Sequence, residues 1–60
     1  MILAHHFKIK KNKGGEYVAY FMHNSEAIFW TEAYASKAGA KNAIASIKKN
    51  GPDAETVDES

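Results

Sequence analysis

Three histidines are the residues whose type first suggests a metal site: His5, His6 and His23. His5 and His6 are neighbours in a segment that alternates between apolar and polar residues, so their side chains point to opposite faces of a strand. Only His5 and His23 can share a face, and two histidines without a third ligand make a poor metal site. The chain has no cysteine, which excludes zinc sites built on thiolates. We therefore expect no metal and no cofactor.

Tyr34, Ser36 and Lys37 have the side chains of a nucleophile with a neighbouring base. Their positions argue against catalysis, because Ser36 stands where a helix begins and its hydroxyl is needed to cap the first turn. Tyr34 falls in the turn before that helix. The sequence contains no phosphate-binding loop, no HExxH motif and no nucleophile elbow. We expect a protein that is not an enzyme, and we assign no catalytic residue.

The elements that would position these residues form an α+β fold in the order β-β-β-α-β. Alternating apolar and polar residues predict a first strand over residues 3–10, and segments rich in aromatic and β-branched residues predict strands over 16–23 and 27–32. The connections at 12–15 and 24–26 contain the asparagine, glycine and serine residues typical of tight turns. Connections this short join antiparallel strands.

A helix is predicted over residues 36–50, with Ser36 as its N-cap. Gly51 suits a left-handed C-cap, and Pro52 cannot continue the helix. Gly39 is unfavourable in the first turn, so it either allows a close backbone approach or has no role. The apolar residues fall within an arc of about 100° and form one narrow stripe that should pack on the sheet: Ala40, Ala43, Ile44 and Ile47.

The size of the chain predicts a single domain over residues 1–60 that does not complete its core alone. A chain of this length buries only about 60% of the surface that it exposes when unfolded. Small domains usually need a disulfide, a metal or a second chain. Since a disulfide is excluded, a homodimer is expected. The segment over 54–57 is predicted as a short fourth strand, with two apolar residues among its four: Ala54, Glu55, Thr56 and Val57.

Charge is unevenly distributed along the chain, although the net charge is only +1. Lysines gather near the start and carboxylates near the end: Lys8, Lys10, Lys11 and Lys13, then Asp53, Glu55, Asp58 and Glu59. Two interpretations stay open. Both segments are simply solvated, or the acidic segment lies beside the basic first strand of the same or another chain, where each opposite-charge pair would contribute roughly 0.2–1 kcal/mol.

Nothing at the start of the chain resembles a signal peptide, and no apolar run approaches the ~20 residues of a membrane span. We expect a soluble, cytoplasmic protein that does not bind membranes.

One face of the predicted sheet is a candidate interaction face. If the helix covers the side with Phe7, Phe21 and Phe29, the opposite side carries an aromatic and basic set: Lys8, Lys10, Val18, Tyr20, Met22, Ile28 and Trp30. We favour a protein partner for this face. Incidental exposure is a second interpretation. The alternative function is weak binding of single-stranded nucleic acid, with bases stacked on Tyr20 and Trp30 beside Lys8 and Lys10.

The motifs together resemble the YegP-like family of small proteins of unknown function. The matching pieces are Phe7 and Ile9, Glu16-Tyr17, Asn24 and Glu26, Thr31-Glu32, Tyr34, Ser36-Lys37, Asn42-Ala43-Ile44, Ser46-Ile47-Lys48-Lys49-Asn50 and Asp53-Ala54. The resemblance implies a β-β-β-α-β unit that pairs with a second copy into one continuous sheet and exchanges its C-terminal strand. It transfers no catalytic residue. Trp30 departs from the family pattern, which favours a small polar residue there.

Overall fold

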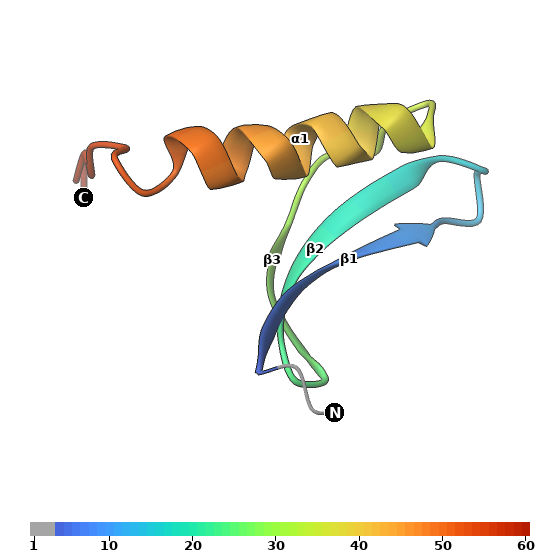
Figure 1. Ribbon diagram of the computed structural model, residues 1–60, viewed down its shortest axis with the longest axis horizontal. Helices are drawn as coiled ribbons and strands as arrows, with labels where there is room; N and C mark the ends of the chain where they lie inside the picture. Colours follow the sequence, from blue (N-terminus) through green and yellow to red (C-terminus); the bar gives the residue numbers. More distant parts are fainter. Residues whose placement is uncertain (1–3) are drawn as a thin grey trace.

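The computed structural model describes residues 4–60 as a three-stranded antiparallel sheet with one helix across one of its faces (Figure 1). The strands are β1 (His5–Lys11), β2 (Tyr17–His23) and β3 (Glu26–Trp30), and the helix is α1 (Lys37–Asn50). The sheet order is β1-β2-β3, so β1 and β3 form its two free edges. The predicted α+β architecture of this part is confirmed. The predicted start of the first strand at Leu3 lies outside the described residues.

The first turn is closed mainly by Asn12. The Asn12 backbone N–H donates to the Glu16 carbonyl at 2.8 Å, and the Asn12 side-chain oxygen accepts the Glu16 N–H at 2.9 Å. Gly15 has a φ of 80°, a conformation that glycine adopts without steric cost. The second turn is shorter and places Asn24 at a φ of 56°, which asparagine tolerates better than most residues.

Strand β3 ends at Trp30, two residues before its predicted end, and Thr31 explains why. The Thr31 N–H donates to the Ala19 carbonyl at 2.9 Å, as a strand residue would. Its hydroxyl oxygen then takes the place of a backbone carbonyl, because it accepts the Ala19 N–H at 3.1 Å. The same hydroxyl donates to the Glu32 carbonyl at 2.9 Å. Threonine side chains can compete with the backbone in this way, and here that ends the regular ladder.

The chain returns to the sheet at Tyr34. Tyr17 and Tyr34 exchange two backbone hydrogen bonds of 2.7 Å and form an isolated antiparallel bridge. This bridge fixes the point from which α1 departs. A Cβ atom at Gly39 would lie only 3.0 Å from the Cβ of Tyr34. Gly39 is therefore present because the first turn of α1 approaches Tyr34 closely.

Helix α1 begins as predicted and ends differently. The Ser36 hydroxyl accepts the Gly39 N–H at 3.2 Å from an extended backbone, so Ser36 is the N-cap. Gly51 is not left-handed, which corrects the prediction: its φ and ψ are −61° and −45°, and its N–H donates to the Ile47 carbonyl at 2.8 Å. A Cβ there would press on that same carbonyl, so glycine is needed for space. No helix within residues 4–60 has the length and apolar character to cross a membrane.

The buried core of residues 4–60 is small. It contains Val18, Ala19, Met22 and Ala40. Helix α1 packs on β2 and β1 but not on β3. The rest of the predicted helix stripe, Ala43, Ile44 and Ile47, is only half-buried. One face of the sheet is thus covered along β2 and β1 and left open toward β3.

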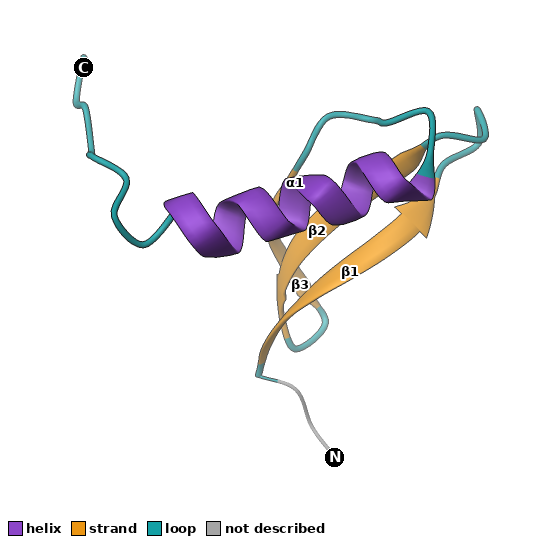
Figure 2. Cartoon of the chain, turned by 45° about the horizontal axis from the view of Figure 1, so that its top comes forward, coloured by secondary structure: helices purple, strands orange, loops and turns teal. Residues whose placement is uncertain are grey.

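Residues 54–60 have no regular secondary structure in the single chain and are exposed. The segment leaves the end of α1 and runs away from the sheet (Figures 1 and 2). The Ala54 N–H donates to the Gly51 carbonyl at 3.0 Å, which turns the chain just after the helix. The fourth strand predicted over 54–57 is not formed within one copy.

The contact between Gly39 and Tyr34 gives a testable prediction. Gly39→Ala should lower the free energy of unfolding by about 1 kcal/mol, because the crowding of 1–3 kcal/mol expected from overpacking exceeds the roughly 1 kcal/mol gained in helix propensity. Asn42→Ala is the matched control. It improves propensity at an exposed position of the same helix and should raise stability by up to about 0.6 kcal/mol. Urea unfolding followed by circular dichroism measures both, and a stabilised Gly39→Ala variant would contradict the contact.

Candidate interaction site

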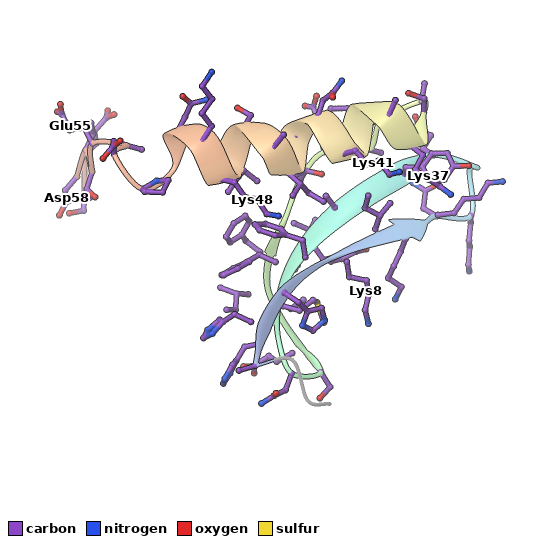
Figure 3. All side chains as sticks on the ribbon, viewed as in Figure 1. Lys8, Lys37, Lys41, Lys48, Glu55 and Asp58 are labelled. Atoms are coloured by element: carbon purple, nitrogen blue, oxygen red, sulfur yellow. The ribbon has the colours of Figure 1, made fainter. Side chains whose placement is uncertain are left out.

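The face of the sheet opposite α1 is the first candidate, and we call it the outer face. The β1–β2 register pairs Lys8 with Tyr20, Lys10 with Val18 and His6 with Met22. The β2–β3 register adds Trp30 beside Tyr20. Since Lys48 of α1 lies over the Phe7 ring at 5.8 Å, the Phe7 side faces the helix and the Lys8 side faces away. Figure 3 shows Lys8 pointing away from α1.

Three side chains of the outer face form a connected group. The Lys10 ammonium lies 5.7 Å from the centre of the Tyr20 ring, within cation–π range. The rings of Tyr20 and Trp30 are 5.9 Å apart and tilted by 43°. Trp30 is 61% exposed. The arrangement offers two aromatic rings and an ammonium group to a ligand.

Two of the residues that the sequence assigns to the outer face are not accessible on it. Val18 and Met22 have the predicted orientation, but both are buried, so neither can contact a ligand. They lie on the central strand with neighbours on both sides. Met22 stands between His6 and Ala27, and Val18 stands beside Lys10. The exposed members are therefore Lys8, Lys10, Ile28 and Trp30, and Tyr20 is half-buried among them.

Ile28 is exposed on the edge strand β3 and lies at a β-bulge. Phe21 pairs with Phe29 and Met22 pairs with Ala27, so Ile28 has no partner on β2. The bulge places an apolar side chain, 51% exposed, at the free edge of the sheet. No periodicity in a five-residue strand would have predicted it, since a bulge depends on how the neighbouring strand pairs.

The helix-side face carries a row of aromatic rings that α1 covers only in part. Phe7 and Phe21 have ring centres 5.1 Å apart, and Phe21 and Phe29 are 5.3 Å apart. Phe29 belongs to β3, the strand that α1 does not reach, and it remains 43% exposed. The sequence predicts that these residues face the helix. It does not show that the helix stops short of them.

His5 and His23 continue this row. They pair across β1 and β2, and their rings stack with centres 4.6 Å apart, so the two histidines do meet as the shared face suggested. His6 is on the other face, with its Nδ1 atom buried. Within residues 4–60 no group of three potential ligands gathers around the pair.

The acidic groups after α1 lie far from the lysines of the sheet and of the start of the helix. Figure 3 shows Lys8, Lys37 and Lys41 on the side of the sheet and the start of the helix, and Glu55 and Asp58 at the far end. The Ser60 hydroxyl donates to the Asp58 carboxylate at 2.6 Å and its backbone N–H donates at 2.9 Å. These two hydrogen bonds lower the pKa of Asp58.

Comparison with known proteins assigns the chain to a family. Residues 12–58 match the profile described as "Domain of unknown function (DUF1508)". The chain belongs to the DUF1508 family. The match includes the helix, most of the sheet and nearly all of the acidic segment, and it agrees with the resemblance to YegP-like proteins noted above.

Relatives of this DUF1508 chain have been found in several bacteria. A UPF0339 protein of Caulobacter vibrioides is 74% identical over 57 residues, which cover 95% of this chain and 97% of that protein. The UPF0339 protein YegP of Yersinia pestis is 48% identical over 48 residues, which cover 78% of this chain but 43% of YegP. The NMR solution structure of a protein from Haloferax volcanii has a TM-score of 0.80 and 32% identity, covering 90% of this chain and 93% of that one.

The outer-face contact between Lys10 and Tyr20 can be measured by a double-mutant cycle. Lys10→Ala should lower the free energy of unfolding by about 0.5–1 kcal/mol, the range for an exposed cation–π pair. The same change in a Tyr20→Leu background should have almost no effect, because the ring is gone. Equal losses in both backgrounds would show that Lys10 does not interact with Tyr20.

Proposed function

We propose that this DUF1508 chain works as a homodimer in which residues 54–57 of each copy form a strand on the sheet of the other. In this proposal the dimer is a non-enzymatic module of the cytoplasm that binds a protein partner through its outer face. The observation that best supports the dimer is the small size of the buried core.

The core is too small for an independent domain. Four residues are buried among residues 4–60, two of them are alanines, and no large side chain there is fully buried. Burying one large apolar side chain contributes about 1.5–3 kcal/mol, so leaving Ile28, Phe29 and Trp30 about half exposed forgoes about 2–5 kcal/mol in total. The stability of a typical domain is only about 5–15 kcal/mol. A second copy would supply the missing contacts.

The exposed area supports the same interpretation. The chain has an accessible surface of 4939 Å², whereas a compact protein of 6.6 kDa exposes about 3,900 Å². The difference of about 1,000 Å² is close to the roughly 800 Å² that each partner buries in a standard interface. The radius of gyration, 12.8 Å, is likewise larger than the roughly 10.4 Å expected for 60 residues.

Two surfaces would be covered by the second copy. One is the helix-side aromatic row around Phe29, which α1 leaves open. The other is the acidic segment itself, where Val57 is 67% exposed. The partial match to YegP also fits the proposal, because 43% of a relative is close to the share that one of two tandem units would occupy.

The geometry of the polar residues supports a role other than catalysis. The Ser36 hydroxyl accepts the Gly39 N–H and caps α1. Tyr34 is placed by its backbone pairing with Tyr17. Ser36 and Tyr34, two of the three catalytic candidates of the sequence, therefore each have a structural role in the fold. The outer face is the surface that dimerisation through the helix side would leave free, and its aromatic rings are of the type enriched in protein interfaces.

A second candidate function is weak binding of single-stranded nucleic acid by the same outer face. The observation that favours it is the connected group of Lys10, Tyr20 and Trp30. Exposed rings of this kind can stack bases, and each stacked base contributes about 1–3 kcal/mol. The net charge of +1 gives little general attraction to phosphates, so we place this function second.

Sedimentation equilibrium tests the dimer. The full chain at micromolar concentration should have twice the 6.6 kDa mass of one copy. Val57→Asp should weaken the dimer about 10- to 100-fold, the equivalent of losing one buried aliphatic side chain. Ser60→Ala, in the same segment, should leave the dimer unchanged. A stably folded monomer for the unmodified chain would refute the dimer.

Fluorescence of Trp30, the only tryptophan of the chain, separates the two candidate ligands. If the outer face binds protein, adding a single-stranded oligonucleotide should leave the emission unchanged at about 50 mM and at about 200 mM salt. Nucleic-acid binding would instead quench the emission at low salt and lose affinity steeply at the higher salt. Lys10→Gln is the control variant, since it should weaken such binding without removing the reporter.

A further inference from the structure

The strand residues of the outer face carry charge of one sign. Lys8 and Lys10 lie there on β1, with His6 beside them. The one carboxylate within β1, β2 and β3 belongs to Glu26, which pairs with His23 on the helix side. A ligand placed on the outer face would therefore meet two ammonium groups and no carboxylate from these strands.

Charge and apolar surface are separated along one row of this face. The registers place Lys8, Tyr20 and Trp30 side by side on β1, β2 and β3. Neighbouring strands lie about 4.8 Å apart, so the row is about 10 Å long. The two lysines stand at its β1 end, and the exposed side chains of Trp30 and Ile28 stand at its β3 end. A ligand that covers the whole row needs an anion at one end and an apolar group at the other.

Tyr20 joins the two ends of the row. The Lys10 ammonium lies 5.7 Å from the centre of the Tyr20 ring, and the Trp30 ring follows at 5.9 Å on the other side. A cation held over a ring has fewer positions to lose when an anion binds it, which lowers the entropy cost of binding. Trp30 is 61% exposed, so it has most of its surface left to bury. Tryptophan is among the residues that most often anchor a protein interface.

The same geometry is unfavourable for stacked bases. The Tyr20 ring is half-buried and has Lys10 over it, so it offers little free area for stacking. The rings of Tyr20 and Trp30 are inclined by 43°, so they do not form one flat platform for two successive bases. Both lysines stand at the β1 end, whereas single-stranded nucleic acid is held by cations that follow its phosphate backbone. A peptide fits this row better than a strand of nucleic acid.

We propose that the outer face binds an acidic stretch of a different protein, with a carboxylate on the two lysines and an aromatic or aliphatic side chain packed on Trp30. This assignment rests on the protein-binding role proposed above and specifies the chemistry of the partner. In an extended stretch the carboxylate and the apolar side chain should stand about three residues apart, because three residues span about 10 Å. The lysines also discriminate against basic partners, since like charges brought together at an interface are costly.

Selection from a library of random linear peptides displayed on phage tests the chemistry of the partner. The peptides are selected on the immobilised full chain and then compared on three variants, after circular dichroism has shown that each variant folds. Trp30→Ala removes the apolar anchor, and Lys10→Glu reverses one charge of the outer face. Lys49→Glu is the matched control, because it makes the same change of net charge in the last turn of α1, away from the outer face.

The expected result is a shared pattern among the selected peptides. They should carry an aspartate or glutamate about three residues from an aromatic or aliphatic residue. The unmodified chain and the Lys49→Glu variant should retain them. The Trp30→Ala and Lys10→Glu variants should lose them, because each lacks one end of the row.

The other outcomes separate the chemistry of the partner from protein binding itself. Selected peptides that lack carboxylates but still depend on Trp30 would overturn the acidic partner and leave protein binding by the outer face intact. If no selected peptide depended on Trp30, both would be refuted. Quenching of Trp30 by a single-stranded oligonucleotide in that case would favour the second candidate function. Sedimentation tests the dimer separately, so its outcome is independent of these.

Titration calorimetry of one selected peptide places its two ends on the row. Replacing the acidic residue of the peptide by its amide should weaken binding to the unmodified chain roughly threefold to tenfold, because a charge contact is lost. The same replacement should strengthen binding to the Lys10→Glu variant, where the carboxylate is repelled. Trp30→Ala should weaken binding of either peptide by about tenfold or more. Equal losses on the unmodified chain and on Lys10→Glu would overturn the placement of the carboxylate at the lysines.

Discussion

The structure depends on how little of the sheet one helix can cover. The apolar stripe of α1 is narrow and built largely from alanine, so it packs closely along β2 and β1 and does not reach β3. Ala40 is buried, whereas Ile44 and Ile47 are only half-buried. Phe29, the exposed end of the aromatic row that begins at Phe7, lies in the uncovered part of the face.

The position of the helix is set by a few contacts at its start. The Thr31 hydroxyl ends β3, and the Tyr17–Tyr34 bridge brings the chain back beside β2. Ser36 then caps the helix, and Gly39 lets the first turn approach Tyr34. These contacts hold the start of α1 firmly, while its far end extends past the sheet and carries the acidic segment outward (Figure 2). The same geometry that leaves the core open directs residues 54–59 away from their own sheet.

The two faces of the sheet therefore have different roles in the proposed protein. The helix side would be used in assembly, because it holds the uncovered ring of Phe29. The outer face keeps Lys10, Tyr20 and Trp30 in one group, away from α1. An assembled dimer would present this group twice, and two weak contacts held together bind more strongly than one.

The sequence by itself determined the order of the three strands and the helix, the facing of the strand residues and the helix start at Ser36, because period-two alternation and capping are local properties. The fourth strand predicted over 54–57 is not formed within one copy. It also determined the charge contrast between Lys8–Lys11 and Glu55–Glu59. Only the tertiary structure decided that Thr31 ends β3, that Ile28 bulges outward, that Val18 and Met22 are buried and that Gly39 meets Tyr34. Each of these depends on how one element packs or pairs with another. No local pattern encodes such a contact.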